Sequence, residues 1–351
     1  MNMITDIRLR SQQLLKPEFK DPRDLVSWMG GMQAQDYPRA KWALGTRLKS
    51  ATIRTVDEAI WRGDILRTHV MRPTWHFVTS EDIRWMLKLS SQRIITACNS
   101  FARSNGIDIP ESLYTKANDH FCKILEGNNH LTKQELGDEM VKAGIIPDPA
   151  AVGYLITRAE QEGIICSGND KEGKFTHALL EERAPMAKEL PREEALALLA
   201  RKYFRSHSPA TLDDFVWWSG LSLTEARQAV ALIDSELVED KFSSQTFFVH
   251  QQWKKRMRSC DVLHFLPPYD EYLISYKDRT AAMDKEHHPK AFNNFGIFYP
   301  VILHNGRIVG NWKKMVKRGE ISIETSFFEE CRKPDNEQIE KAADRYKRFV
   351  F

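Results

Sequence analysis

The chain has 351 residues, of which 42% are hydrophobic and 28% are charged. This length exceeds one typical compact core, so we expect two to four units. The 51 basic residues outnumber the 48 acidic ones by three, which permits nucleic-acid binding without requiring it. No run of about 18 apolar residues is present, and the first six residues do not resemble a signal peptide. We therefore expect a cytoplasmic protein with no membrane partner.

The cysteines predict neither a disulfide framework nor a structural zinc site. The five cysteines are scattered and form no Cys-X-X-Cys pair. We expect reduced thiols, no metal and no cofactor. The five are Cys98, Cys122, Cys166, Cys260 and Cys331.

The first helical patterns flank a short break. Asp21 and Pro22 begin a helix that a Gly-Gly pair ends, and a new helical pattern begins at Pro38. In this break Gln33 and Gln35 are two residues apart, so they share a side in an extended segment but not on a helix. Their neutral amides can hold a water molecule or a base edge. Alternatively, they satisfy backbone groups freed by the break between the helices.

Residues 1–105 are predicted to form a first winged-helix unit with a helical link at about 80–104. Four helices precede two strands, at 65–71 and 75–78, and alternation places Arg67 and His69 on one face. These polar residues either contact phosphates and line a cleft, or form the solvated face of a half-buried strand. The candidates on this hairpin are Arg67, His69, Arg72 and His76.

Two further units repeat the order of three helices and a hairpin. In residues 106–190, Thr132 and Glu135 are typical of a capping box, and strands are expected at 164–168 and 175–179. In residues 191–255, Thr211 is expected to cap a helix, and strands follow at 237–239 and 246–249. This order is the winged-helix (helix-turn-helix) plan.

Residues 256–351 favour strands. Asn305-Gly306 between apolar runs predicts a hairpin, residues 320–327 alternate as a strand does, and Asp335 is expected to cap a last helix. The expected fold is α+β, with tandem winged-helix units followed by a small C-terminal β-barrel or sheet.

Several motifs in one order resemble the winged-helix DNA glycosylase family typified by AlkZ and YcaQ. They lie at residues 32–36, 67–76, 266–270 with 276–279, and 306–312. The resemblance covers nearly the whole chain. It implies tandem winged helices and a C-terminal β-barrel arranged as a clamp around duplex DNA.

The resemblance also implies a function. Members of this family hydrolyse the N-glycosidic bond of alkylated bases, especially N7-alkylguanine, and some unhook interstrand crosslinks. Their catalytic motif is glutamine, an apolar residue, then glutamine or aspartate. Here the motif is Gln33-Ala34-Gln35, as in the AlkZ branch, and the adjacent Asp36 leaves open a contribution from a carboxylate.

Two amides suit this chemistry because an N7-alkylated purine is already cationic and leaves with little protonation. The enzyme then has to place a water molecule and tolerate oxocarbenium-like charge, which positioning and oriented dipoles can supply. We assign Gln33 and Gln35 jointly to this role. No lysine stands at the motif to form a Schiff base with the sugar, so we expect a monofunctional glycosylase.

The expected partner is double-stranded DNA, bound by a monomer. Basic clusters at 254–258 and 313–318 add candidates for phosphate contact. The alternative function is that of a non-enzymatic winged-helix DNA-binding protein or transcriptional regulator. The residues expected to contact DNA are Arg47, Arg67, His69, Arg72, His76, Trp312, Lys313 and Lys314.

Overall fold

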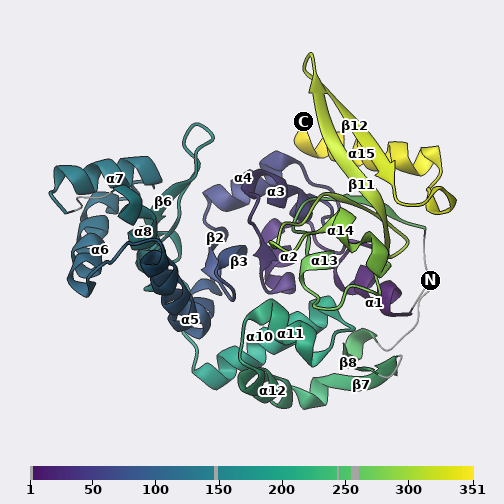
Figure 1. Ribbon diagram of the computed structural model, residues 1–351, viewed down its shortest axis with the longest axis horizontal. Helices are drawn as coiled ribbons and strands as arrows, with labels where there is room; N and C mark the ends of the chain where they lie inside the picture. Colours follow the sequence, from purple (N-terminus) through teal and green to yellow (C-terminus); the bar gives the residue numbers. More distant parts are fainter. Residues whose placement is uncertain (1–2, 146–148, 243–244, 254–260) are drawn as a thin grey trace. The chain divides into compact units, whose positions relative to one another are not determined.

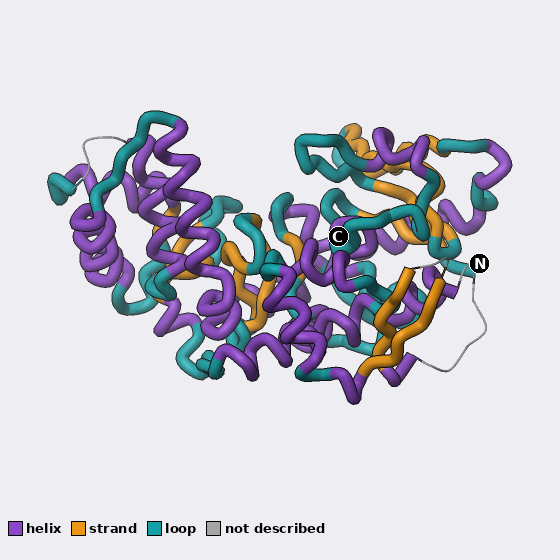
Figure 2. The backbone as a smooth tube through the Cα atoms, turned by 60° about the horizontal axis from the view of Figure 1, so that its bottom comes forward, coloured by secondary structure: helices purple, strands orange, loops and turns teal. Residues whose placement is uncertain are grey.

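The computed structural model describes residues 3–145, 149–242, 245–253 and 261–351. The chain divides into two compact units, each containing helices and strands (Figures 1 and 2). Unit 1 consists of residues 1–57 and 196–351, and unit 2 consists of residues 58–195. The predicted first domain, residues 1–105, therefore falls partly in each unit. The finer division at 105, 190 and 255 stays a prediction.

Unit 1 begins with short helices whose ends follow the sequence signals. The Asp21 side chain accepts a hydrogen bond from the Arg23 N–H at the start of α2, and Gly30 ends that helix in the left-handed region. The predicted helix starts near residues 22 and 38 are confirmed. The helices are α1 (Met3–Ser11), α2 (Pro22–Met29), α3 (Tyr37–Gly45) and α4 (Ile53–Trp61), which ends in unit 2.

The second stretch of unit 1 contains three helices and a hairpin in the predicted order. Thr211 and Asp214 form a reciprocal capping box at α11, and Ser222 and Glu225 form another at α12. The elements are α10 (Arg192–His207), which begins in unit 2, α11 (Leu212–Ser219), α12 (Leu223–Ala231), β7 (Leu237–Phe242) and β8 (Gln245–His250).

The C-terminal part of unit 1 contains a four-stranded antiparallel sheet in the order β12-β11-β10-β9. Strands β12 and β9 are its edges, so among the described residues the sheet does not close into a barrel. Of the two expected forms, barrel or sheet, the small sheet is confirmed. Figure 1 shows β11 and β12 extending as a long hairpin. The elements are β9 (Leu263–Leu266), α13 (Glu271–Ile274), α14 (His288–Ala291), β10 (Val301–His304), β11 (Arg307–Lys317), β12 (Glu320–Phe327) and α15 (Asn336–Val350).

The sheet and α1 share one apolar core. Leu9 packs with Leu266, Tyr272 and Leu303 in this cluster of buried side chains. The turn between β10 and β11 uses Asn305 and Gly306, both with positive φ, as the sequence predicts. The N-terminal and C-terminal ends of the chain therefore stabilise the same unit.

Unit 2 has a hairpin, a long helix and a second helical group with strands. Strands β2 and β3 pair antiparallel from Ile65 opposite Thr79 to Val70 opposite Thr74. The predicted capping box of Thr132 and Glu135 is present at α7. The tandem winged-helix arrangement stays a prediction. The elements are β2 (Ile65–Val70), β3 (Thr74–Thr79), α5 (Ile83–Ser104), α6 (Glu111–Leu125), β4 (Leu131–Thr132), α7 (Lys133–Lys142), α8 (Val152–Gln161), β5 (Ile165–Ser167), β6 (Thr176–Leu179) and α9 (Leu180–Arg183).

Candidate functional site

The glutamine loop, residues 30–36, connects α2 to α3. Gly30 and Gly31 both have positive φ, of 76° and 130°, and a Cβ on Gly30 would lie 2.8 Å from the Cβ of Lys202. A glycine at 30 therefore suits both the turn and the close packing. The loop continues through β1 (Met32–Gln33), and the Asp36 side chain accepts a hydrogen bond from the Arg39 N–H at the start of α3.

The two glutamines differ in their exposure. Gln33 is only 5% exposed, and Ala34 is fully buried, whereas Gln35 is exposed. The loop is therefore buried at Gln33 and reaches the surface at Gln35. The expectation that both amides project to one side stays a prediction.

A buried carboxylate fixes the backbone of this loop. The Gln33 N–H donates to Glu271 Oε1 at 2.5 Å, Trp218 Nε1 donates to Glu271 Oε2 at 3.2 Å, and the Ser275 hydroxyl also donates to Oε2. The ring of His207 lies 3.6 Å from the same oxygen. Glu271 thus connects the loop to three helices of unit 1, α10, α11 and α13.

Glu271 is charged in this environment. Burial alone would raise its pKa, but the His207 ring and the hydrogen bonds from Ser275 and the Gln33 N–H together lower the pKa to about 2. Burial also lowers the pKa of His207. An ionised carboxylate therefore lies one hydrogen bond from the backbone of the candidate catalytic motif. Sequence reasoning missed Glu271, although it directly follows the 266–270 motif.

Arg47 is not a DNA contact in this structure, so that expectation is corrected. Its side chain is 0% exposed and forms a bidentate ion pair with Asp270, at 2.8 and 2.7 Å. Its second terminal nitrogen also donates to Gln12 Oε1 at 3.0 Å. The guanidinium cannot reach a phosphate from this position, and it stabilises the segment that leads to Glu271.

The expectation that Trp312 contacts DNA is also corrected, because its side chain is buried, whereas its two lysine neighbours are accessible. Trp312 is 7% exposed, its indole N–H donates to the Leu266 carbonyl at 2.7 Å, and its ring stacks with Phe265. Lys313 and Lys314 are exposed on β11, and Lys313 forms a surface ion pair with Glu324 at 3.1 Å. These two lysines remain candidates for DNA contact.

In unit 2, the predicted alternation along β2 is confirmed, because Arg67 and His69 both contact the ring of Trp75. The Arg67 guanidinium lies 4.1 Å from the Trp75 ring centre, and the His69 and Trp75 ring centres are 3.8 Å apart. Arg67 is 8% exposed and lies 4.9 Å from the Phe175 ring as well. Burial against aromatic rings leaves Arg67 little exposed surface, and its role in binding DNA stays a prediction.

The histidines of this hairpin have different environments. His76 is 0% exposed, and its Nδ1 lies 2.9 Å from the Thr74 carbonyl. In this structure His76 therefore has no exposed surface with which to contact DNA, contrary to the expectation. His69 Nδ1 lies 2.7 Å from the buried carboxylate of Glu160. His69 and Arg72 are half-buried, and their roles stay predictions.

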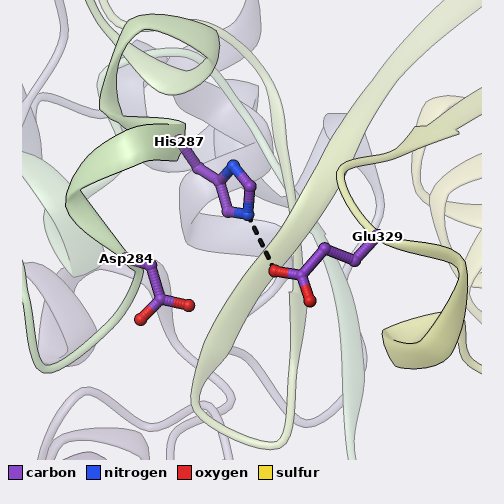
Figure 3. A group of neighbouring side chains, drawn as sticks. All are labelled: Asp284, His287 and Glu329. Carbon is purple, nitrogen blue, oxygen red and sulfur yellow. Dashed lines mark hydrogen bonds and ion pairs between the residues drawn. The ribbon is translucent and has the colours of Figure 1, made fainter.

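Three side chains of unit 1 lie close enough to hold a cation. Donor atoms of Asp284, His287 and Glu329 lie within 4.8 Å of one another, and Figure 3 shows the 2.8 Å contact of His287 with Glu329. However, Asp284 pairs with Arg307 and Arg332, each at 2.7 Å. Hydrogen bonds from these arginines lower the pKa of Asp284 to about 2. The carboxylate is engaged by two cations, and the cluster is an ion-pair network.

Some sequence expectations fall outside the described residues. The basic cluster at 254–258 and Cys260 lie in the segment that the structure does not describe. Cys98, Cys122 and Cys166 are free thiols. Among the described residues, no helix has the length and apolar character needed to cross a membrane.

The comparisons with known proteins identify the class. Residues 26–349 match the model of a family described as DNA glycosylase AlkZ-like, and the chain belongs to this family of DNA glycosylases. One relative is an interstrand DNA cross-link repair glycosylase of Streptomyces sahachiroi, 23% identical over 320 residues and matched over 85% of each chain.

A solved structure has the same fold. The match is to Streptomyces sahachiroi DNA glycosylase AlkZ, with a TM-score of 0.81 and 21% sequence identity. It covers 99% of this chain and 95% of that one.

Proposed function

We propose that this chain hydrolyses the N-glycosidic bond of cationic, alkylated bases in duplex DNA, with N7-alkylpurines as the main substrates and interstrand crosslinks among the candidate lesions. Gln33 and Gln35 hold the attacking water and the sugar. Catalysis requires no metal or cofactor, and it proceeds by direct hydrolysis without a Schiff base. The family assignment supports the enzyme class, and the glutamine loop supports the site.

One observation carries the assignment of the site. The Gln33 N–H donates a hydrogen bond of 2.5 Å to the buried, ionised carboxylate of Glu271. This bond holds the backbone of the motif between α2 and α3. A water-positioning group must be held in place before the substrate arrives, because much of the catalytic gain comes from preorganisation. The buried bond at Gln33 supplies this support on one side, and the exposed Gln35 can meet the DNA on the other.

The charge of Glu271 also fits a cationic transition state. As the base departs, the sugar gains oxocarbenium-like positive charge, which a nearby negative charge stabilises over several ångströms in a site that excludes water. Glu271 accepts the Gln33 N–H and does not itself touch the substrate in this proposal. It acts as a positioning residue, whereas the two glutamine amides are the catalytic groups.

DNA binding is assigned to the exposed cations of unit 1. The outer half of β11 is exposed and contains Lys313, Lys314 and Lys317, and Arg318 follows at the turn. Cations on an exposed hairpin can contact phosphates without reading the sequence. This matches a repair enzyme, which must bind DNA of any sequence.

The test measures base release from a duplex containing N7-methylguanine. We expect Gln33→Ala and Gln35→Ala each to slow single-turnover release by about 100-fold, the size of effect seen when one preorganised polar group is removed. Gln92→Ala replaces an exposed glutamine on α5 and serves as the matched control. Unchanged thermal unfolding and DNA binding in the variants would separate a catalytic loss from misfolding.

The lesion panel tests the chemistry. We expect release of N7-methylguanine but not of the uncharged O6-methylguanine, because neutral amides cannot protonate a poor leaving group. Full activity of both glutamine variants would refute the site assignment. Duplex binding without base release from any lesion would instead indicate the alternative, a DNA-binding regulator.

A further inference from the structure

A second polar site lies at the other end of α3. A pocket of about 690 Å³ is formed by Trp42 and Gly45 from α3, the segment from Leu48 to Thr55 with Lys49 and Ser50, and α15. Helix α15 contributes Arg345 and Arg348. All of these residues belong to unit 1. We call this hollow the cationic pocket.

The walls of the pocket are held by close packing of α3 and α15. The Trp42 ring lies 5.1 Å from Tyr346 and 5.0 Å from Phe349, measured between ring centres. A Cβ on Gly45 would lie 2.6 Å from the Phe349 ring, so only a glycine allows this approach without movement. The position of α15 against α3, and with it the shape of the pocket, is therefore fixed by the packing of unit 1.

The charge of the pocket is unbalanced. It contains the cations Lys49, Arg345 and Arg348, and none of the described residues that line it is acidic. Within the described parts of the chain, no carboxylate lies within ion-pair distance of Lys49 or Arg348. The neighbouring Lys347 differs, because its Nζ lies 3.7 Å from Asp344.

The environment of Arg345 disfavours its positive charge. Its guanidinium donates to the Thr46 carbonyl at 2.8 Å, with longer contacts to the Gly45 and Leu48 carbonyls. Burial and the nearby charge of Arg348 lower the pKa of Arg345. Two arginine side chains thus line one pocket that has no carboxylate among its described lining residues, an unfavourable arrangement that a bound anion would relieve.

We propose that the cationic pocket binds a phosphate group, and that this group is a backbone phosphate of the DNA. Arginine guanidinium groups suit phosphate oxygens because they can donate two parallel hydrogen bonds. Ser50, which also lines the pocket, has a hydroxyl that can act as a neutral donor. The choice of a DNA phosphate rests on the proposed function, whereas the binding of a phosphate group does not.

Helix α3 relates the pocket to the glutamine loop. The loop precedes the first residue of α3, and Gly45 at its last residue lines the pocket. Nine helical residues at about 1.5 Å each separate the two ends by about 14 Å. One strand of DNA advances about 3.4 Å along the helix axis per phosphate, so the span corresponds to about four phosphates. A duplex of ordinary length is therefore long enough to span the distance between the two sites.

The first experiment measures binding to an undamaged duplex at several salt concentrations by fluorescence anisotropy. We expect Arg348→Ala and Lys49→Ala each to weaken binding by about 10-fold at low salt and to reduce the salt slope by about 0.9 per lost phosphate contact. Lys347→Ala, on the same helix but paired with Asp344, is the matched control and should stay within about 2-fold of the unaltered protein.

The second experiment identifies the source of the phosphate. The thermal unfolding of the full chain is measured with inorganic phosphate and, at equal ionic strength, with chloride. Stabilisation by phosphate that Arg348→Ala abolishes supports the site. If the same variant leaves duplex binding unchanged, the phosphate comes from a free ion and not from DNA.

The inference is overturned if Arg348→Ala and Lys49→Ala match Lys347→Ala in both experiments. Neither measurement involves base release, so failure of the proposed glycosylase activity would leave these results interpretable. Conversely, loss of phosphate binding would not remove the assignment of Gln33 and Gln35. Arg348 and Lys49 are both exposed. Thermal unfolding of their variants in chloride, unchanged from the unaltered protein, would confirm that they fold.

Discussion

The buried charges of unit 1 and the cations of the pocket beside α3 are arranged in opposite ways. Near the glutamine end, Glu271 accepts three hydrogen bonds. In the interior, the neighbouring Asp270 pairs with Arg47, which lies two residues past the last residue of α3. At the other end, Arg345 and Arg348 line a pocket whose described lining residues include no carboxylate. Matched buried charges hold a backbone in one place, whereas unmatched cations near the surface favour a bound anion. Arginine thus stabilises the interior of unit 1 at Arg47 and lines a surface pocket at Arg345 and Arg348.

Among the substitutions that test this contrast, the largest effect on stability is expected at Arg47. We expect Arg47→Ala to lower the free energy of unfolding by about 3–5 kcal/mol, because it leaves Asp270 buried and without its bidentate partner. Lys49→Ala, two residues further along and exposed, should change it by less than about 0.5 kcal/mol. Denaturant unfolding followed by tryptophan fluorescence gives both values. Equal stability of the two variants would contradict the structural role of Arg47.

Glu271 offers the next largest effect. In Glu271→Gln, the new amide places an NH₂ group against at least one of the donors that now bind the carboxylate. We expect a loss of about 1–3 kcal/mol in the free energy of unfolding, together with slower base release because Gln33 is less firmly held. Asp240→Asn, an exposed acidic residue on β7, is a control for the loss of one negative charge.

The stability of the protein should also depend on pH through Glu271. Its folded pKa, about 2, lies below the ordinary value of 4.5, so the folded state holds this proton less tightly than the unfolded state. The resulting stabilisation is complete above about pH 4.5 and is lost as the pH falls toward 2. The stability difference between the unaltered protein and Glu271→Gln should therefore shrink from pH 6 to pH 3. A constant difference would show that folding does not lower the pKa of Glu271.

Local signals in the sequence predicted much of this architecture. The helix boundary at Asp21 and Gly30, the capping box at Thr132 and the turn at Asn305-Gly306 depend on neighbouring residues only, and the structure confirms each one. The position of the glutamine motif between two helices was predictable for the same reason. The resemblance to a glycosylase family then assigned a chemistry that spacing alone could not.

Long-range partners could not be predicted in this way. Arg47 pairs with a residue 223 positions away, and Trp312 is covered by residues of β9 and α15. In the sequence both resemble accessible DNA contacts, because only the folded chain shows which side they face. Conversely, Arg345 and Arg348 lie in an ordinary amphipathic helix, and their meeting with Lys49 depends on the packing of α15 against α3.

The smallest expected effect concerns Asp36, beside the glutamine motif. Its carboxylate caps α3 by accepting the Arg39 N–H, and an asparagine can do the same at similar stability. Asp36→Asn therefore removes the charge but keeps the cap. If Gln33 and Gln35 alone position the water, base release should stay within about 2-fold and the free energy of unfolding within about 0.5 kcal/mol. A 10-fold or larger loss of base release, with unchanged stability and DNA binding, would add the Asp36 carboxylate to the catalytic groups. It would also mean that the glutamine end of α3 uses a third, charged group to stabilise the oxocarbenium-like sugar.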